Sequence, residues 1–298
     1  MSRITKYSSI KKDTLETEFG CVTVNSVEID DEKMEELITN FVLEDENLKY
    51  MFCDANFAEN KTRDLLRFIP PITPPSINKF VTKSCVDNHN FYSFLAEGLM
   101  GLVFRDLMGY ELGAALIDAN ETLNDTHSGV DGCLYDDEKE IIVLGEAKFY
   151  KKLYDGFTEI ISNFTKDDSF FNKLSSLFIK ARNNKNAVKI ILRKLGYEDI
   201  KELDLQQFLS IDFVFCGFVL HELSTTKKEK FKDGTAYKSL SISSNNIIDN
   251  MKRLIDSLDI SDKEYNIYMY HLPVKSKEEL IIRVISKAYE LLEEGRVK

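Results

Sequence analysis

The chain contains 298 residues, 43% of them hydrophobic and 30% charged, which suits one large domain or one domain with an extension. Its net charge of −11 argues against a simple nucleic-acid-binding protein, because contacts to phosphate groups require Lys and Arg. No apolar run approaches the roughly 20 residues that span a bilayer, the first residues lack the apolar core of a signal peptide, and the five scattered cysteines form no Cys-x-x-Cys pair. We therefore expect a cytoplasmic protein without a membrane span, a disulfide framework or a zinc knuckle.

The charge is distributed unevenly along the chain. Between Asp13 and Glu59 there are 14 acidic and 2 basic residues, whereas the segment from Ser169 to Lys194 has seven basic residues and no acidic one. The N-terminal part therefore sets the overall sign, and the basic segment is either a track for phosphate groups or a solvated helix face. The residues that we expect to contact nucleic acid are Lys151, Lys152, Lys173, Lys180, Arg182 and Lys185.

Residues 1–80 form an acidic segment of mixed structure. The pattern predicts a strand pair around Cys21–Ile29 and an amphipathic helix over Asp31–Leu43. The run Phe68–Ser76 then holds four of the five prolines and cannot be helical. It is either a stiff connector or a packed surface loop within a single domain. We predict an acidic N-terminal α+β extension over residues 1–80 and a main domain over residues 81–298.

The next predicted helix contains an acidic residue among apolar ones. Apolar spacing predicts a helix over Asn90–Gly109 and then a short strand over Glu111–Asp118. Glu97 has apolar neighbours on its side of this helix, where burying a carboxylate is costly without a cation or a hydrogen-bond donor. Glu97 is thus either a residue at the edge of the apolar stripe, paired with Arg105 or Lys83, or a residue that faces a bound cation.

A β-hairpin is predicted in the middle of the chain. Two apolar runs, Val130–Tyr135 and Ile141–Ala147, flank a cluster of polar residues. The loop between them is expected at Asp137–Glu138 or, in a longer form, at Asp136–Lys139. Both loops have an even number of residues, and both give the same strand register.

This register determines which side chains share a face of the hairpin. It places Asp131 opposite Leu144 and Gly129 opposite Glu146. Because side chains alternate along a strand and paired residues share a face, Asp131, Glu146 and Lys148 all project to the same side. A loop with an odd number of residues would put Glu146 on the other face, so the even loop is part of the prediction.

Two carboxylates and an amine on one face point to a specific chemistry. An Asp and a Glu close together repel each other unless a cation lies between them, and hard oxygen ligands suit Mg²⁺ or Mn²⁺. Lys148 could then orient a metal-bound water or stabilise charge that develops on a phosphate group. The plainer alternative is a surface hairpin with an ordinary Glu–Lys pair.

The remaining predicted elements are mostly helices, interrupted by two strands. The run Asp212–Leu220 is almost entirely apolar, as expected for a central strand covered on both faces. Glu159 lies on the polar side of the helix that follows the hairpin and is a further candidate for the site. These elements are a helix from Leu153, helices over 170–183 and 186–195, the strand Asp212–Leu220, a basic loop over 227–232, a helix over 246–258, a strand over Tyr265–Leu272 closed by Pro273, and a terminal helix over Lys277–Glu294. The order predicts an α/β fold with a mixed sheet flanked by helices.

The hairpin residues resemble a known signature. Asp131 followed by Glu146-Ala147-Lys148 resembles the Asp…(Asp/Glu)-x-Lys signature of the restriction-endonuclease-like nucleases, the PD-(D/E)xK superfamily. The surrounding residues, Ser-Gly-Val-Asp-Gly and Leu-Gly-Glu-Ala-Lys-Phe-Tyr, resemble more narrowly the HamA family, the nuclease subunit of Hachiman anti-phage defence systems, from about Phe91 onward. The superfamily often has Pro before its first Asp, where this chain has Val130.

The resemblance implies a restriction-endonuclease-like fold and a bound Mg²⁺ or Mn²⁺. Asp131, Glu146 and the backbone carbonyl of Ala147 would be metal ligands. Glu97 would match the Glu that such enzymes often supply from a helix just before the sheet. Lys148 would support the attacking water.

Together, these features predict a metal-dependent DNA endonuclease that acts in anti-phage defence. The chain contains no P-loop motif, so the resemblance implies a separate helicase partner of the HamB type. The acidic N-terminal part would help to dock this partner or would shield the basic segment until DNA arrives. Two alternatives are a nuclease fold that binds DNA or a partner protein without turnover, and a hydrolase of a small phosphate ester.

Overall fold

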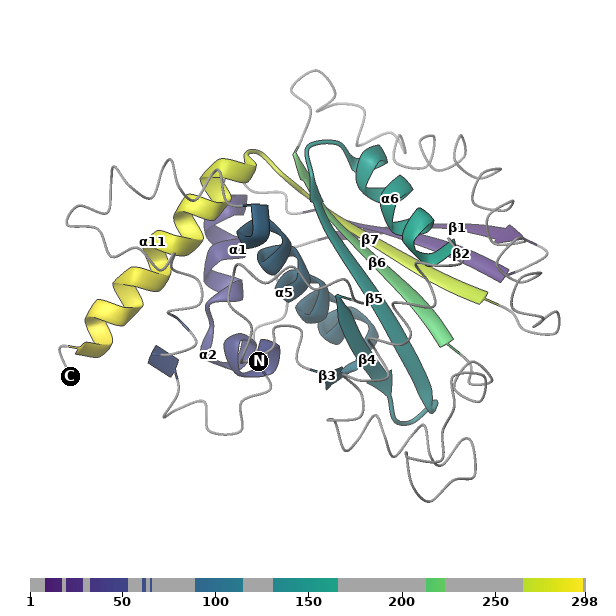
Figure 1. The fold of residues 1–298 in the computed structure, drawn as a ribbon, viewed down its shortest axis with the longest axis horizontal. Helices are drawn as coiled ribbons and strands as arrows, with labels where there is room; N and C mark the ends of the chain where they lie inside the picture. The colour runs from purple at the N-terminus through teal and green to yellow at the C-terminus, as the bar shows by residue number, and fades with distance from the viewer. Residues whose placement is uncertain are drawn as a thin grey trace.

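The computed structural model describes residues 9–17, 20–28, 33–52, 61–62, 65, 89–114, 131–165, 213–222 and 265–296. Within these residues, strands from both ends of the chain form one sheet with helices packed against it (Figure 1). The strands are β1 (Ser9–Thr17), β2 (Gly20–Glu28), β3 (Glu111–Ala114), β4 (Gly132–Asp136), β5 (Ile141–Tyr150), β6 (Phe213–Glu222) and β7 (Tyr265–Val274). The helices are α1 (Met34–Val42), α2 (Asp45–Met51), α5 (His89–Met108), α6 (Leu153–Thr165) and α11 (Lys277–Arg296).

The sheet is mixed, as predicted. Its seven described strands follow the order β1-β2-β7-β6-β5-β4-β3. The central strands β2, β7, β6 and β5 are parallel to one another, whereas β1 pairs antiparallel with β2 at one edge, and β4 and β3 are antiparallel at the other. The predicted α/β class with a mixed sheet and flanking helices is therefore confirmed.

Strand β6 lies in the middle of the sheet and is buried on both faces. Its side chains from Val214 to His221 are all buried, which accounts for the nearly unbroken apolar run in the sequence. The expectation of a covered central strand over Asp212–Leu220 is confirmed within one or two residues at its ends.

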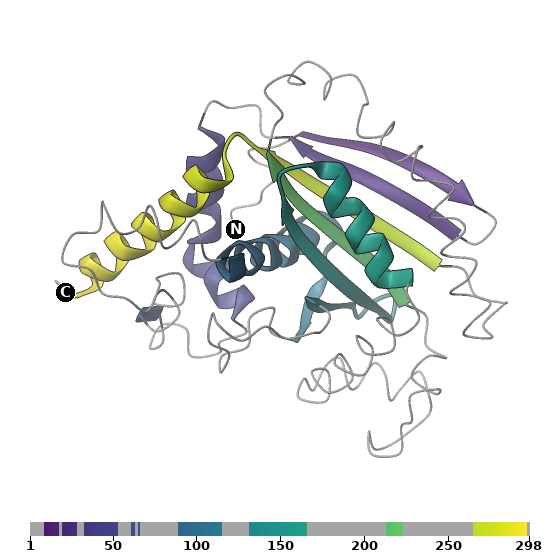
Figure 2. The same cartoon turned by 45° about the horizontal axis from the view of Figure 1, so that its top comes forward.

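Helices α5 and α6 cover opposite faces of the sheet (Figure 2). On one face, Gly145 of β5 lies against Met100 of α5, where an added Cβ would come within 2.7 Å of the Met100 methyl carbon. On the other face, Gly217 of β6 lies against Ile160 of α6, where an added Cβ would come within 2.9 Å of the Ile160 side chain. Glu146 is paired with Gly217, and paired residues share a face, so Glu146 and Lys148 lie on the α6 side.

The N-terminal segment is built into this sheet. Strand β2 pairs with β7 from Gly20 to Ser26, and α1 lies beside α11 (Figure 1). The predicted strand pair and helix of this segment are thus present, and the strand pair begins earlier than expected, at Ser9. The proline-rich run Phe68–Ser76 lies outside the described residues, and the division of the chain at residue 80 stays a prediction.

The turn between β7 and α11 joins several parts of the fold. The Glu35 carboxylate of α1 accepts hydrogen bonds from the backbone N–H groups of Lys275 and Ser276, at 2.6 and 3.2 Å. The Glu222 carboxylate of β6 accepts one from the N–H of Lys277 at 3.0 Å, and the Lys277 ammonium donates to the carbonyl of Phe149 in β5 at 2.8 Å. These bonds satisfy N–H groups at the start of α11 that have no partner within the helix.

One further expectation is wrong, one helix was not expected, and several predicted elements fall outside the described residues. Strand β7 does not stop before Pro273 but continues through it to Val274, because a proline near a strand end removes only one ladder hydrogen bond. Helix α2 was not expected from the sequence. The predicted helices over 170–183, 186–195 and 246–258 and the basic loop over 227–232 lie outside the described residues. None of the helices that the structure describes could cross a membrane, because none is both long and apolar enough.

Candidate active site

The hairpin of β4 and β5 has a four-residue loop, the length of the longer predicted form, but displaced by one residue along the chain. The strands pair from Gly132–Gly145 to Asp136–Ile141, so residues 137–140 form the loop. Two features fix this position of the loop. The Asp136 carboxylate accepts hydrogen bonds from both the backbone N–H and the ammonium of Lys139, and Glu140 takes a left-handed backbone conformation with φ 54°.

The register is therefore shifted by two residues from the predicted one. Leu144 pairs with Cys133, not with Asp131. Because the loop still has an even number of residues, the predicted alternation holds and Glu146 and Lys148 share a face. Continuing the observed register by one pair places Asp131, the residue directly before β4, opposite Glu146 itself.

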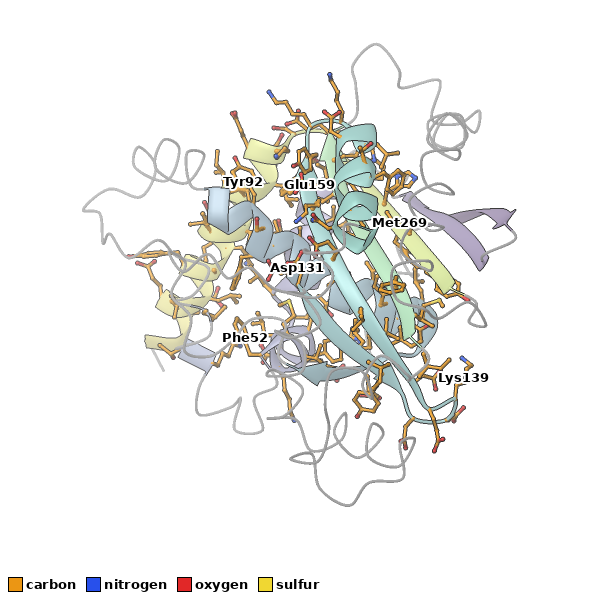
Figure 3. All side chains as sticks on the ribbon, turned by 45° about the vertical axis from the view of Figure 1, so that its right-hand side comes forward. Phe52, Tyr92, Asp131, Lys139, Glu159 and Met269 are labelled. Atoms are coloured by element: carbon orange, nitrogen blue, oxygen red, sulfur yellow. The ribbon has the colours of Figure 1, made fainter. Side chains whose placement is uncertain are left out.

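Asp131 directs its carboxylate at the edge of β5. Its Oδ2 atom accepts a hydrogen bond from the backbone N–H of Ala147 at 2.8 Å and lies 3.9 Å from the Lys148 ammonium. The side chain is 17% exposed. Asp131 thus occupies the point where β4 leaves β5, far from the hairpin loop that Lys139 marks in Figure 3.

Glu146 is a buried carboxylate with two identified donors. Its side chain is 2% exposed. The Oε1 atom accepts a hydrogen bond from the Asn163 side-chain amide of α6 at 2.7 Å and lies 2.8 Å from the Lys148 ammonium. Sequence reasoning missed Asn163, although its spacing of four residues from Glu159 places both on one side of α6.

Lys148 lies among three carboxylates. Besides Asp131 and Glu146, the Oε1 atom of Glu159 on α6 is 3.7 Å from its ammonium. Burial by itself would lower the pKa of Lys148, but the charges of Asp131, Glu146 and Glu159 and the hydrogen bond to Glu146 together raise it well above its usual value. Lys148 is therefore a permanent cation at neutral pH, suited to stabilise negative charge and not to accept a proton.

The three residues taken from the hairpin pattern thus meet on the side of the sheet covered by α6, and a fourth residue, the acid Glu159, joins them. The model of the HamA family matches residues 117–288, more than half of the chain and all four of these side chains. This chain belongs to the HamA family. A search of curated proteins found no match.

The HamA match begins after Glu97, the remaining predicted catalytic residue. Glu97 lies on α5, which packs against the face of β5 opposite to Glu146. The Tyr92 ring lies 5.2 Å from that of Phe149, and Met100 meets Gly145, so α5 runs antiparallel to β5. With a rise of about 1.5 Å per residue in a helix and 3.3 Å in a strand, Glu97 lies level with Ala147. Its part in the site stays a prediction.

The Ala147 carbonyl faces the edge of β5 at which Asp131 lies. In a β-strand the N–H and C=O of one residue point to the same side. The Ala147 N–H binds Asp131, so its carbonyl faces the same edge of β5, beyond the last described pair with β4 at Gly132–Gly145.

The donor atoms of this HamA site suit a hard divalent cation. Asp131 and Glu146 both present oxygen atoms to the Lys148 ammonium, which shows that the space between them stabilises positive charge. In the described part of the chain, no group of three or more His, Cys, Asp or Glu side chains is arranged to hold a metal ion. A metal here would be held by the two carboxylates and the Ala147 carbonyl, with the predicted ligand Glu97 or water completing its coordination.

Two of the six predicted nucleic-acid contacts can be located. Lys151 and Lys152 are exposed and directly follow β5, at the end of the strand that carries Lys148. The others, Lys173, Lys180, Arg182 and Lys185, lie outside the described residues.

Proposed function

We propose that this HamA protein is a metal-dependent nuclease that hydrolyses phosphodiester bonds in DNA. The observation that carries the proposal is the meeting of Asp131, Glu146 and Lys148 where β4 separates from β5. An acid before one strand and Glu-x-Lys in the next, on a mixed sheet flanked by helices, also supports a restriction-endonuclease-like fold.

Each residue has a defined task in the proposed reaction. Asp131 and Glu146 would hold Mg²⁺ or Mn²⁺, with the Ala147 carbonyl and Glu97 as further ligands. When bound, the metal would polarise the scissile phosphate and lower the pKa of a water. Lys148, always protonated, would orient the attacking water and stabilise negative charge on the phosphate, while Asn163 fixes the Glu146 carboxylate. The exposed Lys151 and Lys152 would bind the DNA backbone.

Membership in the HamA family suggests a component of Hachiman anti-phage defence. Because the sequence contains no P-loop motif, translocation along DNA would come from a helicase partner. The acidic N-terminal part offers a surface for this partner, opposite in charge to the basic segment over residues 169–194.

The test is cleavage of supercoiled plasmid with Mg²⁺, ATP and the helicase. The variants E146A and K148A should cut at least about a hundredfold more slowly than the unmodified protein, because each removes a group that stabilises the transition state. E138A and K139A, which change the same residue types in the exposed hairpin loop, should cut normally.

A module that only binds DNA or the helicase would give a different pattern. It would leave the plasmid uncut even with helicase present, and E146A would bind both ligands as the unmodified protein does. That outcome would refute the nuclease proposal.

A further inference from the structure

Lys148 has three carboxylates near its ammonium, more than one positive charge can neutralise. Glu146 forms its closest ion pair at 2.8 Å, Asp131 lies 3.9 Å away, and Glu159 on α6 lies 3.7 Å away. The described residues give these three carboxylates one shared ammonium, so in their ionised forms they carry two more negative charges than it balances. Such an excess is costly in a partly buried place, because the effective dielectric constant is lower there than in water.

A divalent ion would balance this excess. Two carboxylates, Asp131 and Glu146, match the charge of one such ion, and the third, Glu159, matches the charge of Lys148. The ammonium, however, now lies between the first two, so it repels any cation that binds there. Metal binding is therefore favoured when a second anion can accept the lysine.

Glu159 is placed and held for this purpose. Its Oε1 atom needs to come only about 1 Å closer to the Lys148 ammonium to reach the 2.7–2.9 Å of a charge-assisted hydrogen bond. Its other oxygen, Oε2, accepts a hydrogen bond from the Tyr150 hydroxyl, two residues beyond Lys148 on the same face of β5. The side chain is 40% exposed, so it can adjust without repacking the core.

We propose that Glu159 is a positioning residue that takes over Lys148 when a divalent ion binds between Asp131 and Glu146. The inference rests on the proposed function, because it assumes a metal at these two carboxylates. It assigns Glu159 no contact with the metal. Its role is to remove a competing cation from the metal site while keeping that cation nearby for the phosphate.

The test is Mn²⁺ binding to the full chain without DNA, measured by isothermal titration calorimetry. The proteins are the unmodified chain, E159Q, K148M and the double variant, with circular dichroism as a check of folding. E159Q should weaken Mn²⁺ binding about tenfold when Lys148 is present and less than about threefold in the K148M background. K148M alone should bind Mn²⁺ more tightly than the unmodified chain. D155N, an exposed acid one turn earlier on α6, should bind normally.

The outcomes separate this inference from the proposed function. If E159Q weakened Mn²⁺ binding equally with and without Lys148, Glu159 would be a metal ligand, and this inference alone would be overturned. If E159Q did not weaken Mn²⁺ binding in the presence of Lys148, the inference would be overturned as well. A chain that binds no Mn²⁺ would overturn the inference and the metal-dependent nuclease together.

Discussion

The Glu146 carboxylate is almost completely buried from solvent. A buried carboxylate without partners costs several kcal/mol, and here the Lys148 ammonium and the Asn163 amide both contact Oε1. Asn163 belongs to α6 and Lys148 to β5, so the conformation of Glu146 depends on the packing of α6 on the sheet. The second contact is a single hydrogen bond and can be removed without changing a charge.

The variant N163A should therefore destabilise the protein by about 1–3 kcal/mol, because it takes a donor from a buried acceptor. Urea unfolding followed by circular dichroism measures the loss. T158A, an exposed polar-to-alanine change on the same helix, serves as the control and should stay within about 0.5 kcal/mol. Equal stability of the two variants would show that Asn163 does not hold Glu146.

At the scale of single residues, the sequence predicted the hairpin residues and missed their support. Asp131, Glu146 and Lys148 were recognisable because strand alternation and a short signature fix their relation over a few residues. Asn163 belongs to a different element, and nothing in the local pattern says which side of α6 meets β5. Glu159 was identified only as a candidate for the same reason.

The pairing of β6 and β7 brings two histidines together. His221 Nε2 and His271 Nδ1 are 3.1 Å apart, and both rings are buried. Burial lowers the pKa of His221 to about 4, and burial together with the nearby His221 lowers the pKa of His271 well below its usual value. Both rings are therefore neutral in the folded protein at neutral pH.

This pair should make the fold sensitive to mild acid. Below a pH of about 6.5 the unfolded chain takes up a proton at each histidine, whereas folded His221 does so only near pH 4. The free energy of unfolding should thus fall as the pH drops through this window, by up to about 3 kcal/mol from His221. Urea unfolding at several pH values measures the slope.

The comparison that isolates the pair uses H221Q. This variant removes one titrating ring and should show a shallower fall between pH 6.5 and pH 4 than the unmodified protein. Identical slopes would mean that carboxylates alone cause the acid sensitivity.

Elements with a strong internal pattern were predicted well, and relations between distant elements were not. The apolar run of β6, the apolar spacing of α5 and the amphipathic spacing of α11 gave their types and approximate bounds. The short helix α2 was missed because only Asn47, Leu48 and Met51 are buried in its seven residues. The two-residue register shift of the hairpin came from Glu140, whose left-handed conformation is not apparent from its residue type.

At the scale of the molecule, the acidic N-terminal segment is part of the sheet. A deletion of residues 1–80 would remove β2 from its pairing with β7 and α1 from its packing on α11, so it would test folding instead of partner docking. Nothing in the sequence indicated this arrangement, because the pairing joins residues more than 200 positions apart. Substitutions of exposed charged residues test partner docking without removing a strand or a helix from the fold.

The double variant E36Q/E46Q removes two exposed acids on α1 and α2. If the N-terminal part docks the helicase, this variant should bind it about two- to fivefold more weakly at low salt, and the difference should shrink as salt is added. E293Q/E294Q, which makes the same change at the exposed end of α11, should bind as the unmodified protein does. Binding by biolayer interferometry measures all three. Equal affinities would refute docking through these acids.

The turn at residues 275–277 has a mechanical consequence. Through Glu35 it holds α1, and through the Lys277 ammonium it holds the carbonyl of Phe149, the residue next to Lys148. Tension applied at the acidic end of the protein would thus reach the strand that carries the lysine through a few hydrogen bonds.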